Sequence, residues 1–138
     1  MNAKTIEALL IVAGVLHLAI TSAGLVMTLV LDWRKNLSPL CALTRHIIWT
    51  HGAFVLLTIV AFGVVSLTFP GALSSGEPLA RAVCGFIAAF WAFRLFIGFF
   101  LFDATPHLTR LSLKLGYHGL TVAFTFFVAC YGAAAVLV

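Results

Sequence analysis

Long runs of apolar residues fill most of this chain, and short polar segments separate them. The runs cover residues 6–31, 45–69, 79–102 and 111–138. Each is long enough for an α-helix that crosses a bilayer core of about 30 Å, which takes about 20 apolar residues. The pattern therefore predicts an all-α integral membrane protein whose four transmembrane helices form an antiparallel bundle.

The segments between these runs are short. Residues 32–44 and 103–110 are the charged connections, and residues 70–78 are rich in Pro, Gly and Ser, which favours a turn-rich loop. The first run continues past the small residues that would suit signal cleavage, so we expect it to be a retained helix. Residues 1–138 are thus expected to form a single transmembrane domain.

Composition agrees with a membrane environment. The 138 residues are 63% hydrophobic and 9% charged, and the mean hydropathy is +1.17. Soluble domains are typically about 45–50% apolar and about 25% charged. So few charges cannot cover a water-facing surface, which excludes an ordinary soluble domain, a disordered chain and a nucleic-acid binder built on a basic surface.

The distribution of Lys and Arg predicts the orientation. Five of these cations lie in or beside the two hairpin connections, and two lie at the opposite end of the bundle. They are Arg34, Lys35, Arg45, Arg110 and Lys114 against Lys4 and Arg81. Because cytoplasmic loops carry the excess of Lys and Arg, we expect loops 32–44 and 103–110 in the cytoplasm and both termini outside or in the periplasm.

The chain also has the pattern of two tandem helical hairpins. In each, the second helix carries an aromatic residue followed by His-Gly, at Trp49–Gly52 and at Tyr117–Gly119. A true repeat would relate the hairpins by a pseudo-twofold axis along the membrane normal and place His51 and His118 at equal depth. The alternative is that any two apolar helical hairpins would show this degree of sequence similarity without being a repeat.

Helix geometry places three polar residues from three helices in one layer. With a rise of about 1.5 Å per residue, His51 lies about 9 Å, His118 about 10 Å and Arg94 about 12 Å from the cytoplasmic ends of their helices. Arg94 is the strongest signal, because arginine keeps its charge and a central Arg costs about 2.5–3.5 kcal/mol on insertion scales. The candidate binding residues are His51, His118, Arg94, Trp91, Tyr117 and Trp49, followed by His17, Asp103 and Arg45.

Several ligands fit this layer. His51 and His118 could be the axial ligands of a b-type haem, with Arg94 opposite a propionate and Trp49, Trp91 and Tyr117 as walls. A quinone or lipid-like headgroup is a second possible ligand. A third is another metal ion bound by the same two histidines, but such a site would need further ligands. The alternative is that the two histidines only form hydrogen bonds between helices.

Two further patterns have structural explanations. Small and hydroxyl-bearing residues recur every three or four positions on the first helix, at Gly14, Thr21, Gly24 and Thr28 together with His17, which favours close helix approach. The 3 cysteines do not suggest a full disulfide framework, and Cys84 and Cys130 are expected to be small apolar fillers.

The function expected from these patterns is the binding of a redox cofactor or hydrophobic ligand, haem-like or quinone-like, in the cytoplasmic half of the bundle, with electron transfer as one use. A non-catalytic anchor or structural subunit of a larger membrane complex is the alternative, and an oligomeric transporter or channel is the second. No catalytic residue stands out, because the sequence has no recognisable nucleophile–base arrangement and no Gly-rich phosphate loop.

Overall fold

A computed structural model of the protein describes residues 1–101 and 109–138. Four long helical segments dominate it: α1 (Ala3–Val30), α3 (Ala42–Thr68), α5 (Pro78–Phe96) with its π-helical continuation η1 (Ile97–Leu101), and α6 (Leu111–Val136). Each is long and apolar enough to cross a membrane. The prediction of an all-α, four-helix, multi-pass membrane protein is therefore confirmed.

Local sequence signals explain where the helices begin. The Asn2 side chain accepts a hydrogen bond from the Thr5 backbone N–H (2.8 Å), which caps α1. Pro78 occupies the first turn of α5, where a missing backbone N–H costs nothing. The expected and observed ends of the four helices differ by no more than a few residues, as fraying ends usually do.

Two short helices lie in connections where the sequence analysis predicted none. The helix α2 (Trp33–Leu37) follows Asp32, whose left-handed backbone (φ 49°) turns the chain sharply after α1. The helix α4 (Pro70–Leu73) lies within the segment expected to be a turn-rich loop. Pro70 initiates it, because the fixed φ of proline suits a first helical turn.

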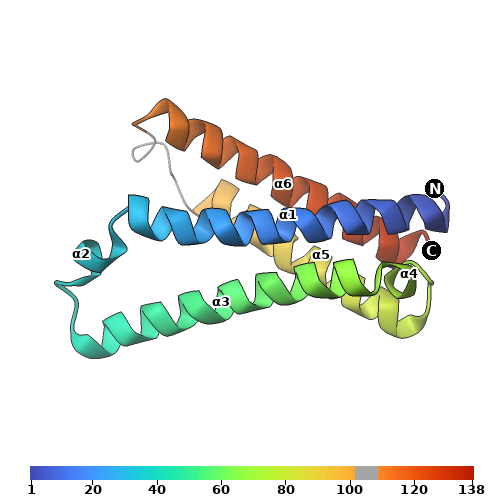
Figure 1. The fold of residues 1–138 in the computed structure, drawn as a ribbon, viewed down its shortest axis with the longest axis horizontal. Coiled ribbons are helices and arrows are strands. Elements are labelled where there is room, and N and C mark those ends of the chain that lie inside the picture. Colours follow the sequence, from blue (N-terminus) through green and yellow to red (C-terminus); the bar gives the residue numbers. More distant parts are fainter. Residues whose placement is uncertain (102–108) are drawn as a thin grey trace.

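The four long helices converge at the end of the molecule that holds both termini and diverge toward α2 (Figure 1). The strongest packing is of α1 against α3 and of α5 against α6, and α1 also packs on α6. The bundle thus consists of two antiparallel hairpins joined mainly through α1.

The buried core occupies the convergent end. It takes side chains from all four long helices: Ile6, Leu10, Ala13, His17, Ile59, Phe62, Ser66, Cys84, Ile87, Trp91, Phe127, Cys130, Tyr131 and Ala134. Around it, many large apolar side chains on every long helix are exposed. Such an apolar outer surface fits the hydrocarbon of a bilayer and not water.

Glycines allow α1 and α3 to cross closely within this core. A Cβ atom added at Gly14 would lie 2.7 Å from Leu67 Cγ, and one added at Gly63 would lie 3.1 Å from His17 Cβ. A Cβ at Gly24 would meet Leu56 at 3.3 Å. The small-residue face predicted on the first helix is therefore the face that packs against α3.

Candidate functional site

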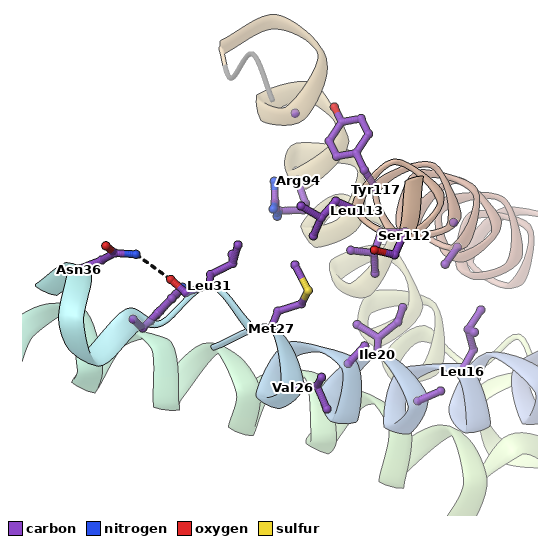
Figure 2. A pocket seen from close by; sticks show the side chains of 18 of the residues that line it. Leu16, Ile20, Val26, Met27, Leu31, Asn36, Arg94, Ser112, Leu113 and Tyr117 are labelled. Atoms are coloured by element: carbon purple, nitrogen blue, oxygen red, sulfur yellow. Dashed lines mark hydrogen bonds between the residues drawn. The ribbon is translucent and has the colours of Figure 1, made fainter. Parts of the chain in front are cut away.

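A cavity of about 1030 Å³ lies at the divergent end of the bundle. One side is formed by α1 and α2, and the other by α5, η1 and α6 (Figure 2). Ile48 of α3 also reaches it. The cavity exists because the helices that pack tightly near the termini have separated here.

The lining of the cavity is mostly apolar. From α1 it takes a helical face distinct from the one packed on α3, at Leu16, Ala19, Ile20, Ala23, Val26 and Met27. From α6 it takes Leu113, Leu120, Ala123 and two glycines, Gly116 and Gly119, and η1 adds Gly98. A Cβ atom added at any of these three glycines would have no neighbour within 4 Å, so the absent side chains leave open space.

Polar groups occur on both sides of the lining. Arg94 is the one charged residue among the described lining residues, and its side chain points into the open space between the two sides of the cavity (Figure 2). Its guanidinium carbon lies 5.8 Å from the centre of the Phe124 ring, which is cation–π contact. Tyr117, Ser112 and Trp33 also line the cavity and bring groups that can donate hydrogen bonds.

Asn36 is the remaining polar lining residue, and it is already engaged. Its side-chain nitrogen donates to the carbonyl oxygen of Leu31 at 2.6 Å, which ties α2 to the end of α1 (Figure 2). The left-handed turn at Asp32 and this bond together hold α2 across one side of the cavity. The α2 side of the cavity therefore has a defined backbone conformation, and the side-chain nitrogen of Asn36 is already used in holding it.

His17 and Trp91, two of the candidate residues, lie together in the core. His17 Nδ1 is 2.7 Å from the carbonyl oxygen of Ala13, and Trp91 Nε1–H donates to His17 Nε2 at 3.0 Å. A carbonyl only accepts and an indole N–H only donates, so the ring is neutral with its proton on Nδ1. The His17 ring also stacks on Phe127, with ring centres 4.0 Å apart. Nε2 thus joins α1 to α5, while Nδ1 is used in a hydrogen bond within α1.

The two histidines predicted as a pair lie on separate hairpins. His51 is exposed on α3, and its Nδ1 lies 2.9 Å from the carbonyl oxygen of Ile47 one turn earlier. His118 is exposed on α6, where its ring meets the neighbouring Tyr117. Neither lines the cavity. The parts of α3 and α6 that carry them lie on different sides of α1 in Figure 1.

The remaining candidates lie around the cavity end. Trp49 packs edge-on against the cavity-lining Trp33, with ring centres 5.9 Å apart. Arg45 donates to the carbonyl oxygen of Ser38 at 3.3 Å, joining the start of α3 to the loop before it. Asp103 lies outside the described residues. The structure thus brings Arg94 and Tyr117 to one cavity, and it pairs Trp91 with His17 elsewhere.

Within residues 1–101 and 109–138, no three His, Cys, Asp or Glu side chains lie close enough to hold a metal ion. Comparisons of the chain with protein-family models, with curated proteins and with solved structures gave no match. The interpretation of the site therefore rests on its own geometry.

The sequence analysis did not identify the cavity walls. The face of α1 that lines the cavity looks like any lipid-facing stripe, and α2 was not expected at all. One signal was present: Gly116 and Gly119 stand three apart on α6, as residues that share a helix face do. Glycines on one face indicate either close packing or open space, and only the neighbouring helices decide which.

Proposed function

We propose that this membrane protein binds a hydrophobic small molecule, lipid-like or quinone-like, in the cavity between α1 and α6. The observation that carries the proposal is an apolar cavity of about 1030 Å³ with a single charged residue, Arg94, in its described lining. Ligand sites typically combine such an apolar wall with a few convergent polar groups. The apolar faces of α1 and α6 would hold the chain of the ligand, and Arg94 with Tyr117 its polar head.

The position of the cavity agrees with the expected orientation. It opens at the end of the bundle that carries the basic hairpin connections, which the positive-inside rule assigns to the cytoplasmic side. An Arg at membrane depth is by default a functional-site hypothesis, because its insertion costs free energy and such residues are rare outside functional sites. A ligand head with an anionic or carbonyl oxygen would complement it.

Haem binding stays a prediction of the sequence. It needs His51 and His118 as axial ligands, and both lie outside the cavity lining. The absorption spectrum of the protein purified from its own membrane tests it directly, since a Soret band would identify a haem. The anchor and transporter alternatives likewise stay predictions.

Filling the cavity provides a test that does not require knowing the ligand. Gly116→Phe places a ring in the open space beside Gly116, because nothing lies within 4 Å of an added Cβ there. We expect mass spectrometry of organic extracts to find a co-purifying amphiphile with the wild-type protein and at least about tenfold less of it with Gly116→Phe.

The matched control is Gly132→Phe, the same substitution on the same helix at a glycine that also has free space but does not line the cavity. It should retain the amphiphile. Equal loss in both variants, or equal retention in both, would contradict the proposal. Circular dichroism should show unchanged helix content in each variant.

A further inference from the structure

Positive charge is concentrated at the cavity end of the molecule. The connections there and the first turns beside them hold Arg34, Lys35, Arg45, Arg110 and Lys114 against Asp32 and Asp103. The opposite end holds Lys4 and Arg81 against Glu7 and Glu77, so its charges balance. With Arg94 in the cavity itself, the whole formal charge of +4 belongs to the cavity half.

Most of these cations flank the cavity lining closely. Arg34 and Lys35 lie between the lining residues Trp33 and Asn36 on α2. Arg110, just before α6, and Lys114 within it stand on either side of the lining pair at 112–113. Positive-inside targeting explains basic residues in the connections, but it does not explain Arg94 within a transmembrane helix. The same sign of charge at the cavity and around it points to an occupant that is negatively charged.

The depth of Arg94 suits a lipid headgroup. Arg94 precedes the end of η1 at Leu101 by seven residues, which is about 10 Å along the helix axis. The segment from Pro78 to Leu101 contains 24 residues, about 36 Å, and so exceeds a hydrocarbon core of about 30 Å. The long side chain of Arg94 can therefore extend from within the hydrocarbon toward the interface and meet a headgroup that enters the cavity, while the apolar lining continues below it.

We infer that the occupant of the cavity is an anionic phospholipid from the surrounding bilayer, with its phosphate on Arg94 and an acyl chain along α1 and α6. A guanidinium binds phosphate through two parallel N–H···O bonds, which favours a phosphate over a neutral carbonyl head. The cations on α2 and α6 attract the headgroup to the entrance. This inference rests on the proposed function and makes it specific, because it excludes a neutral quinone as the preferred ligand.

The test compares two lipids that differ in the head alone. The full-length protein in dodecylmaltoside micelles is titrated with brominated-chain phosphatidic acid and with brominated-chain diacylglycerol. Quenching of tryptophan fluorescence reports binding, since Trp33 lines the cavity. We expect phosphatidic acid to bind at least about tenfold more tightly than diacylglycerol.

Arg94→Gln should reduce this preference to within about twofold, and Arg94→Lys should retain part of it. Lys4→Gln is the matched control, because it removes one positive charge from an exposed residue at the opposite end of the bundle, outside the lining. It should change the preference less than about threefold. Thermal unfolding followed by circular dichroism confirms that each variant is folded.

Three outcomes would overturn the inference: no preference in the wild type, an unchanged preference in Arg94→Gln, or equal losses in Arg94→Gln and Lys4→Gln. The first two leave the proposed function intact if diacylglycerol or decylubiquinone binds and Gly116→Phe abolishes that binding. If no probe binds the wild-type protein, the proposed function fails together with the inference.

Discussion

At the scale of single residues, Arg94 and His17 are both polar groups inside transmembrane helices, but their surroundings are opposite. His17 is fully buried, and both of its ring nitrogens have hydrogen-bond partners on protein atoms. Arg94 points into an open cavity. A buried polar group whose hydrogen bonds are complete stabilises the fold, whereas a charge facing a cavity is available to a ligand.

The His17–Trp91 bond gives a testable stability effect. Trp91→Phe removes the indole donor and leaves His17 Nε2 buried without a partner, so we expect a loss of about 1–3 kcal/mol in the free energy of unfolding. Equilibrium unfolding in mixed dodecylmaltoside and SDS micelles measures it. Trp49→Phe, at an exposed tryptophan, is the control and should cost less than about 0.5 kcal/mol.

A double variant separates the hydrogen bond from lost packing. His17→Leu with Trp91→Phe should cost less than the two single changes together, because the second change no longer leaves a buried polar atom unpaired. Additive costs would show that the contact between His17 and Trp91 contributes no coupling.

At the scale of elements, the same four helices pack tightly at one end and separate at the other. Gly14 and Gly63 allow the close crossing of α1 and α3 near the termini, and the Ser66 and Tyr131 hydroxyls share a hydrogen bond between α3 and α6 there. Toward α2, Gly116 and Gly119 face open space instead. Glycine thus serves opposite purposes at the two ends: it brings backbones together in the core, and it leaves room in the cavity.

Alanine substitutions distinguish these two uses of glycine. Gly14→Ala places a methyl group 2.7 Å from Leu67 Cγ and 3.1 Å from the Gly63 carbonyl oxygen, so the Leu67 side chain or the two helices must shift. We expect a loss of about 1–3 kcal/mol in the free energy of unfolding in mixed micelles. Gly119→Ala meets nothing within 4 Å and should leave stability unchanged or raise it by up to about 1 kcal/mol. Similar losses in both would refute the close-crossing explanation.

At the scale of the whole molecule, all of the net positive charge lies in the half that contains the cavity, and the end with both termini is balanced. The charge asymmetry has two expected consequences. It orients the chain with the hairpin connections in the cytoplasm, and it gives the cavity a positive potential that favours anionic ligands. Both follow from where a few Lys and Arg side chains lie in an otherwise apolar chain.

Cysteine labelling tests the orientation. Cys41 is exposed at the start of α3, whereas Cys84 and Cys130 are buried, so an impermeant maleimide should modify only Cys41. The Thr44 side chain, 3.0 Å from the Cys41 sulfur, lowers the pKa of this thiol. Because the thiolate is the reactive form, labelling should persist to a lower pH than for an ordinary thiol and decline below that pKa.

We expect labelling of Cys41 only after cells are permeabilised, because the connection 32–44 is expected in the cytoplasm. Ser75→Cys in a Cys41→Ser background places an exposed thiol in the connection at the opposite end of the bundle, and it should label in intact cells. The reverse pattern would place both termini in the cytoplasm.

The sequence by itself determined that the long helices suit lipid and not water, how many of them can span a membrane, and approximately where they end. These properties depend on how many consecutive residues are apolar and on local capping. It also identified Arg94 as exceptional, because a charge in an apolar run is visible without any neighbour. It could not show that His17 and Trp91 pair across 74 positions, or that α1 and α6 separate beside Arg94. In an apolar helix every face looks alike in sequence, and only tertiary packing decided which faces meet a helix, a lipid or a cavity.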